Sequence, residues 1–307
     1  MNRTESNRAP FSAPRRTFLG QATLAAFAAS VSASRPAWAQ ADGGESNRTE
    51  GKPVIYAAIK GGSIGGDYAA MVARLKQLKQ LGYDGVEGAS PGIPNPGDLR
   101  KAIDETEFPV HGVVDMVHWQ DRLSSPDPAI REKGRAALEQ ALHDSHAIGG
   151  SSVLLVPGRV SGAEENHDHV WQRSIVEIRK VLPVASRLGI HILIENVWNG
   201  FCEDPQQFRD YLDEIDSPWV GAYFDIGNCR KFGPAEDWIR TLGSRIVKLD
   251  IKDWGVKNSF CRLGEGDVNW PAVRKALLEI GYSGWATREG SDKSLEDTIE
   301  LTRQLLG

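Results

Sequence analysis

The sequence predicts a single α/β domain folded as a (β/α)8 TIM barrel. Eight short apolar segments alternate along the chain with longer segments in which apolar residues recur at helical spacing. Each pair of segments takes about 25 to 40 residues, as right-handed βαβ units of a parallel sheet do. The stretch from residue 53 to the end also has the length of one barrel, which takes roughly 250 residues.

These periods place the individual elements. Met71, Leu75 and Leu78, for example, recur at about one helical turn between the first two apolar segments. The strands are expected at residues 54–59, 85–87, 110–115, 152–156, 191–195, 220–225, 246–252 and 285–289. The clearest helices are expected at residues 67–81, 128–148, 169–188, 205–215 and 271–280.

A doubly wound open sheet is the competing architecture, and it would need a glycine-rich phosphate-binding turn after an early strand. Residues 60–66 are rich in glycine but lack the Gly-x-Gly-x-x-Gly spacing of such a turn. We therefore interpret this segment as a flexible loop at the mouth of the barrel.

The first 39 residues have the pattern of a twin-arginine export signal. Arg15 and Arg16 precede a short alanine-rich apolar run over residues 18–31, and Ala37 and Ala39 form a small-x-small cleavage site. The run is shorter than the about 18 apolar residues of a membrane span, so no stable membrane insertion is expected after cleavage. Residues 40–52 are expected to be a flexible linker, residues 53–307 the barrel, and the protein periplasmic or extracellular.

The charge of the chain excludes some partners. Removing residues 1–39 takes away five basic residues and one acidic residue and leaves 31 basic against 40 acidic, a net charge of −9. Nucleic-acid binding rests mainly on lysine and arginine, so no nucleic-acid partner is expected. Three cysteines, Cys202, Cys229 and Cys261, indicate no disulfide framework. A homo-oligomer remains possible.

Four predicted strands end in a carboxylate: Glu195, Asp225, Asp250 and Glu289. A single one could be a helix cap or an ion-pair partner. Functional groups of a TIM barrel, however, stand at the carboxyl ends of its strands, so these four are expected to converge. Their mutual repulsion would call for a counter-ion, and an all-oxygen donor set favours Mn²⁺ or Mg²⁺ over Zn²⁺.

The seventh strand alternates between apolar and charged residues. Val247, Leu249 and Ile251 are expected to face the helices, which turns Lys248, Asp250 and Lys252 into the barrel. Charged groups in a barrel interior usually mark a site. Either Lys248 and Lys252 offset the charge of the four carboxylates, or Asp250 is not a metal ligand at all.

Several motifs resemble those of the xylose-isomerase-like barrel family, which includes sugar and sugar-phosphate 3-epimerases, keto-sugar isomerases and inosose dehydratases. The similarity runs from about residue 53 to the end. The motifs are Ile194-Glu195-Asn196, Phe224-Asp225-Ile226-Gly227-Asn228, Asp250-Ile251-Lys252-Asp253, residues 263–270 (LGEGDVNW), residues 281–285 (GYSGW) and Arg288-Glu289.

The resemblance implies a function for each strand-end carboxylate. It makes Glu195, Asp225, Asp250 and Glu289 the metal ligands, and Glu195 and Glu289 also the acid and base at the carbon beside a carbonyl. The chain departs from the family at Asp250 and Asn228, where the family usually has histidine.

Eight further residues are predicted to contact the substrate. Lys252 is expected to be a substrate or electrostatic contact, Asn228 to bind a hydroxyl, and Glu87 to have a substrate-side counterpart in the family. His118 and Trp119 could stack on a sugar ring, or be a surface-loop pair without that role. Arg159, Trp254 and Arg262 follow strands in the same way.

The leading hypothesis is a metal-dependent isomerase or epimerase that acts on a non-phosphorylated keto-sugar through an enediolate, because sugar phosphates are held in the cytoplasm. A lyase of the same fold, dehydrating an inosose-like substrate or cleaving a 3-keto-glycoside, is the enzymatic alternative. A barrel that binds sugar without turning it over is a third possibility. An endonuclease of the same fold would need a histidine-rich zinc site and basic grooves, which this acidic chain lacks.

Overall fold

The computed structural model describes residues 54–61, 64–290 and 292–307. The predicted export signal and linker lie outside these residues. Eight strands form the central sheet: β1 Ile55–Lys60, β2 Gly85–Ser90, β3 Val110–Asp115, β4 Ser152–Leu155, β5 His191–Glu195, β6 Val220–Asp225, β7 Ile246–Ile251 and β10 Gly284–Arg288. They pair in parallel and close into a barrel in the order β1-β10-β7-β6-β5-β4-β3-β2. The predicted fold class is therefore confirmed.

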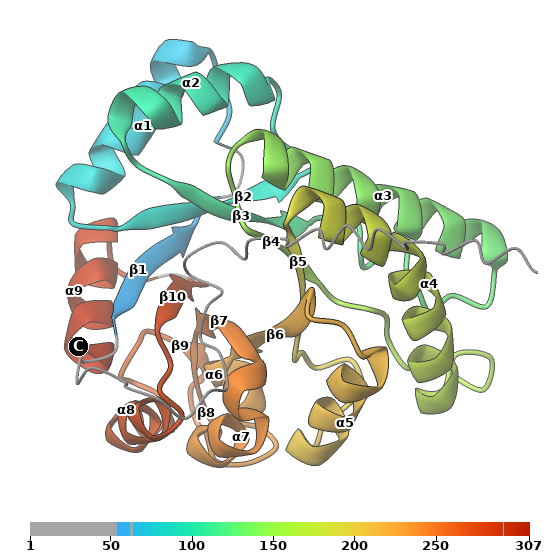
Figure 1. Ribbon diagram of the computed structural model, residues 1–307. Coiled ribbons are helices and arrows are strands. Elements are labelled where there is room, and N and C mark those ends of the chain that lie inside the picture. The colour runs from blue at the N-terminus through green and yellow to red at the C-terminus, as the bar shows by residue number, and fades with distance from the viewer. Residues whose placement is uncertain (1–53, 62–63, 291) are drawn as a thin grey trace, which may run out of the picture. The chain divides into compact units, whose positions relative to one another are not determined.

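Helices surround this barrel (Figure 1). They are α1 Tyr68–Gln80, α2 Pro96–Thr106, α3 Pro128–Ala147, α4 His167–Leu188, α5 Pro205–Ile215, α6 Ile226–Cys229, α7 Ala235–Leu242, α8 Trp270–Glu279 and α9 Leu295–Leu306, with a 3₁₀ turn at Gly243–Arg245. None of the helices in the described part of the chain combines the length and apolar character needed to cross a membrane.

Proline and a capping side chain fix where several helices begin. Asp127 and Asp204 accept hydrogen bonds from the first turns of α3 and α5, and a proline follows each. Proline suits the first turn because the amide it lacks would have no partner there. The predicted starts of both helices are confirmed. Helix α4 begins two residues earlier than predicted, because Asn166 caps it by accepting from the His169 amide.

The core has two layers, as the alternation of side chains along parallel strands requires. Most buried apolar side chains lie between the sheet and the helices, including Ile192, Ile194, Leu249 and Ile251. A small cluster of Leu154, Leu193 and Tyr223 forms the second layer.

The prediction for β7 is confirmed for Leu249 and Ile251 but wrong for Val247. Val247 packs against the small cluster of Leu154, Leu193 and Tyr223 rather than against the helices. The register between β6 and β7 shifts at this point, because Ala222 pairs with Ile246 while Tyr223 pairs with Lys248. A bulge of this kind adds one residue to one strand and breaks the period-2 pattern locally.

A short hairpin that the sequence analysis missed extends the chain beyond β7. Its strands are β8 Asp253–Gly255 and β9 Ser259–Cys261. The carboxylate of Asp253, which is buried, accepts hydrogen bonds from the amides of Gly264 (2.8 Å) and Val268 (3.3 Å) and from Nε1 of Trp270 (3.0 Å). The base of the hairpin is therefore tied to the loop that leads into α8.

Candidate active site and metal centre

The four strand-end carboxylates meet at one end of the barrel. Glu195 and Asp225 are the last residues of β5 and β6, Asp250 lies one residue before the end of β7, and Glu289 follows β10. One carboxylate oxygen from each of the four lies within 4.8 Å of the others. Asp225 and Asp250 are also direct register partners across β6 and β7. The convergence predicted for these four residues is present in the structure.

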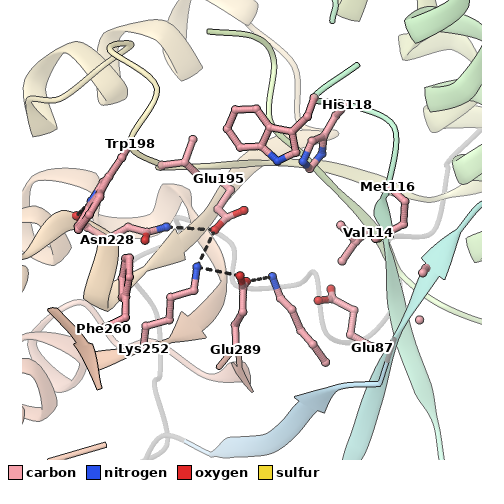
Figure 2. Close-up of a pocket in the computed structure, with 15 residues that line it drawn as sticks. Glu87, Val114, Met116, His118, Glu195, Trp198, Asn228, Lys252, Phe260 and Glu289 are labelled. Atoms are coloured by element: carbon pink, nitrogen blue, oxygen red, sulfur yellow. Dashed lines mark hydrogen bonds and ion pairs between the residues drawn. The ribbon is translucent and has the colours of Figure 1, made fainter. Parts of the chain in front are cut away.

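Two lysines enter this carboxylate cluster. Nζ of Lys252 lies 3.0 Å from Oδ2 of Asp225, 2.9 Å from Oε1 of Glu289 and 3.7 Å from Oε1 of Glu195. Nζ of Lys60 lies 2.6 Å from Oδ2 of Asp250 and also pairs with Oε2 of Glu289. Figure 2 shows Glu289 with a dashed contact to Lys252 on one carboxylate oxygen. Glu289 is thus held by an ammonium group on each of its oxygens.

The expectation that Lys248 offsets the negative charge of the carboxylate cluster is wrong. Lys60 is the second lysine that pairs with the cluster. Lys248 faces the barrel interior, but its Nζ donates to the carbonyl of His111 (2.8 Å) and lies 2.9 Å from Nδ1 of the same residue. Residues two apart on a strand differ by about 6.6 Å in depth, so Lys248 lies a layer below Asp250. Lys60 is the last residue of β1, one position beyond the predicted strand, and no predicted role covered it.

Burial and the two lysines have opposite effects on the pKa values of the four carboxyl groups. Burial raises the pKa of Asp250 well above its usual range, raises that of Asp225, and raises that of Glu195 to about 7. Burial also acts to raise the pKa of Glu289, but Lys60 and Lys252 outweigh it and hold that pKa at about 2. Ionisation of Asp250, Asp225 and Glu195 is unfavourable because these acids lie close together and away from water.

The residues present fit a hard divalent cation. All four candidate ligands are oxygen donors, the set that Mn²⁺ and Mg²⁺ prefer. Oδ1 of Asp250 is buried and has no hydrogen-bond partner among the described residues. Four carboxylates and two ammonium groups carry a formal charge of −2, which one divalent cation balances.

A small hydrogen-bond framework orients Asp225 and Glu195. The Asp225 amide donates to Oδ1 of Asn196 (2.8 Å), whose Nδ2 donates back to the Asp225 carbonyl (2.9 Å). The Asn228 amide donates to Oδ1 of Asp225 (2.6 Å) at the start of α6, and its Nδ2 donates to Oε1 of Glu195 (3.3 Å). Asn228 therefore serves as a hydrogen-bond donor to a candidate acid or base.

A cavity of about 500 Å³ opens above the cluster. Five of the predicted substrate contacts line it: Glu87, His118, Trp119, Asn228 and Lys252. Glu87 is fully buried, and neither of its carboxylate oxygens has a hydrogen-bond partner in the described part of the chain. Burial lowers the pKa of His118 to about 3, so its ring is neutral, and Nδ1 accepts from the Val156 amide.

The cavity lining also contains side chains that the sequence analysis did not single out. Lys60 lies at its floor, and Val114, Met116, Val197, Trp198 and Phe260 form much of its apolar wall. Figure 2 shows Trp198 and Phe260 on one side of Glu195 and Glu289, and Val114, Met116 and His118 on the other.

Three predicted contacts lie outside this lining. Arg159 is exposed. Arg262 pairs with Asp297 at the start of α9 and lines a smaller neighbouring cavity. Trp254 packs edge-on against Trp198 at 5.7 Å between ring centroids, behind the cavity wall. The structure does not bring these three side chains to the cavity.

Comparison with known proteins agrees with this fold. The xylose isomerase-like TIM barrel family matches residues 75–305, so the chain belongs to that family. It is 27% identical to a D-psicose 3-epimerase of Ruminiclostridium cellulolyticum over 70% of this chain and 76% of the relative. It is 24% identical to an L-ribulose-5-phosphate 3-epimerase of Escherichia coli over 73% of this chain and 83% of the relative.

Solved structures share the same architecture. A D-allulose 3-epimerase from Methylomonas sp. superposes with a TM-score of 0.67 at 19% identity, covering 83% of this chain and 98% of that chain. A 3-keto-D-glucoside 4-epimerase from E. coli superposes with a TM-score of 0.69 at 16% identity, covering 82% and 100%.

Proposed function

We propose that this protein is a metal-dependent isomerase or epimerase of a non-phosphorylated keto-sugar. The observation that carries the proposal is the convergence of Glu195 and Glu289 on one cavity together with Asp225 and Asp250. The names of its relatives, sugar 3-epimerases, support the same class of reaction.

The proposed chemistry is proton transfer at a carbon beside a carbonyl. One of Glu195 and Glu289 removes the proton, the electron pair moves onto the carbonyl oxygen to give an enediolate, and the other carboxyl returns a proton to carbon. Lys60 pairs with Asp250 and Lys252 pairs with Glu289, so the two lysines hold these carboxylates in position. Asn228 holds Glu195 through the contact at 3.3 Å.

Glu195, Asp225, Asp250 and Glu289 would hold the divalent cation, Mn²⁺ or Mg²⁺ by donor type. When bound, the cation would supply Lewis-acid polarisation of the substrate carbonyl.

The charge of the cavity supports a substrate without a phosphate group. Among the described residues that line it, Lys60 and Lys252 are the cations, and both are already paired with carboxylates. The remaining charged side chain of that lining, besides Glu195 and Glu289, is Glu87, which would repel a phosphate. Phosphate sites instead use free arginine, free lysine or a helix N-terminus.

The test is exchange of a carbon-bound proton with solvent. The purified protein with Mn²⁺ is incubated in D₂O with free ketoses, and deuterium incorporation at the carbons flanking the carbonyl is followed by NMR. Glu195→Gln and Glu289→Gln should each slow exchange by at least about 100-fold, the usual loss for a general acid or base. Glu300→Gln, an exposed residue on α9, is the matched control and should exchange at the parent rate.

The products separate the alternatives. A new ketose or epimer supports the proposal, whereas loss of water or release of an aglycone would assign the lyase reaction. Binding of the ketose without exchange at any carbon would instead assign a sugar-binding barrel.

A further inference from the structure

Exposed apolar side chains gather at the rim of the candidate active site. Eleven large apolar side chains are exposed in the described part of the chain, and four of them line this one cavity: Met116, Trp119, Trp198 and Phe260. Their exposed fractions are between 37% and 52%. Exposed apolar residues scattered singly need no explanation, but a group around a cavity marks a binding surface.

Two of these side chains form a rigid aromatic wall. The rings of Trp198, after β5, and Phe260, in β9, stack with 4.7 Å between centroids and an angle of 27°. Nε1 of Trp198 donates a hydrogen bond to the Asn228 carbonyl (2.8 Å). Trp254 packs edge-on against the Trp198 ring, and Nζ of Lys231 lies 4.6 Å from the centroid of that ring. The orientation of the pair is therefore set before any ligand arrives, which lowers the entropy lost on binding.

The wall and the carboxylate cluster serve different parts of a ligand. The floor carries Lys60, Glu195, Lys252 and Glu289, which suit the hydroxyl and carbonyl oxygens of one sugar ring. The wall of Trp198 and Phe260 consists of aromatic rings, which stack on flat apolar faces. The cavity volume, about 500 Å³, lies within the range of pockets that bury ligands of drug size.

We propose that the substrate is a glycoside, and that its second ring stacks on Trp198 and Phe260 while the sugar ring bearing the carbonyl lies on the polar floor. This inference rests on the proposed function and names its substrate class. The second ring is either an aromatic aglycone or a second sugar, since both present a flat apolar face.

The experiment compares three keto-glycosides that share one reacting ring. Methyl 3-keto-β-D-glucopyranoside lacks a second ring, the phenyl glycoside has an aromatic one, and 3-keto-cellobiose has a sugar. KM and kcat for proton exchange in D₂O are measured with Mn²⁺ for each probe. The parent protein should show a KM about tenfold lower for at least one two-ring probe than for the methyl glycoside, as expected for an aromatic contact.

Two variants test whether the lower KM for a two-ring probe depends on Trp198 and Phe260. Within each of the variants Trp198→Ala and Phe260→Ala, the ratio of the KM for the methyl glycoside to the KM for the two-ring probe should fall from about ten to near one. Tyr68→Ala, another exposed aromatic but on α1, is the matched control and should keep the difference. Unchanged circular dichroism of the variants would confirm that they fold.

Three outcomes are informative. Equal KM values for all probes, or an advantage that survives in both wall variants, would overturn this inference but leave the proposed function standing. No exchange with any glycoside or free ketose would overturn the proposed function itself. Loss of the advantage only for the phenyl probe, or only for the disaccharide, would identify the second ring.

Discussion

Nζ of Lys60 lies 2.6 Å from Oδ2 of Asp250, a carboxylate with no exposed surface. Burial acts to lower the pKa of Lys60, but Asp250, Glu195 and Glu289 outweigh it and raise that pKa well above its usual range. An ammonium group from β1 thus lies against a carboxylate from β7 inside the barrel.

Replacing Lys60 by Met should destabilise the metal-free protein by about 2 to 4 kcal/mol, because it leaves a buried carboxylate cluster short of one positive charge. Urea unfolding in the presence of a chelator measures the loss. Lys101→Met is the control, since that lysine forms a surface pair with Asp98 and should lose at most about 1 kcal/mol. Adding Mn²⁺ should raise the Tm of Lys60→Met more than that of the parent. Equal losses in the two variants would contradict the role given to Lys60.

Replacing Asp250 by Ala should weaken Mn²⁺ binding by at least about tenfold, because it removes one of four oxygen donors. Titration calorimetry with the chelated and reloaded protein measures the affinity. Asp237→Ala, on the surface of α7, should bind as the parent does. An unchanged affinity in Asp250→Ala would show that Glu195, Asp225 and Glu289 suffice, and that Asp250 serves only Lys60.

Replacing Asp115 by Asn should stabilise the protein increasingly as the pH rises. Burial raises the pKa of Asp115 to about 7, so its protonated form is favoured in the folded state. The stability that this group contributes is present in acid and is lost as the pH rises from about 4 through 7. The stability of the variant relative to the parent should therefore rise by about 2.5 kcal/mol between pH 5 and pH 8. Asn keeps the oxygen that accepts from the Val117 amide.

Urea unfolding at both pH values checks this prediction. Asp104→Asn, which loses only a surface pair on α2, should keep the same difference from the parent at pH 5 and pH 8. A gap for Asp115→Asn that does not widen with pH would mean that the carboxyl ionises normally in the folded protein.

We propose that residues 1–39 direct export by the twin-arginine route. Replacing Arg15 and Arg16 together by Lys should then keep the protein in the cytoplasm with its first 39 residues attached, because such export depends on that pair. Cell fractionation followed by mass analysis of the N-terminus measures both effects. Arg3→Lys is the control and should be exported and cleaved as the parent is. Export of the double variant at the parent rate would refute the twin-arginine assignment.

The fold and the four carboxylates could be predicted because they depend on local pattern. The strand period and the position at a strand end are read within a few residues, and closure of the barrel then brings Glu195, Asp225, Asp250 and Glu289 together. Lys252 was predicted for the same reason.

The features that could not be predicted from the sequence depend on contacts between segments, which no local pattern encodes. Lys60 is the last residue of β1 and is followed by a glycine-rich segment, so the predicted strand ends one residue before it. Val247 changes faces at a bulge that only the pairing of β6 with β7 creates. Trp198 and Phe260 lie on a loop and a hairpin without apolar period, and their stacking joins segments about 60 residues apart in sequence.

The hairpin β8–β9 is anchored at one end and exposed at the other. Asp253 ties its base to the loop before α8, whereas Val256, next to the turn, is 79% exposed and Phe260 stands at the cavity rim. A change of sequence in the outer part of the hairpin therefore leaves the buried anchor and the carboxylates of β5, β6 and β7 untouched. The lining of the cavity can therefore be altered through this short hairpin without altering those carboxylates, which makes the hairpin a suitable segment to randomise in a directed-evolution library.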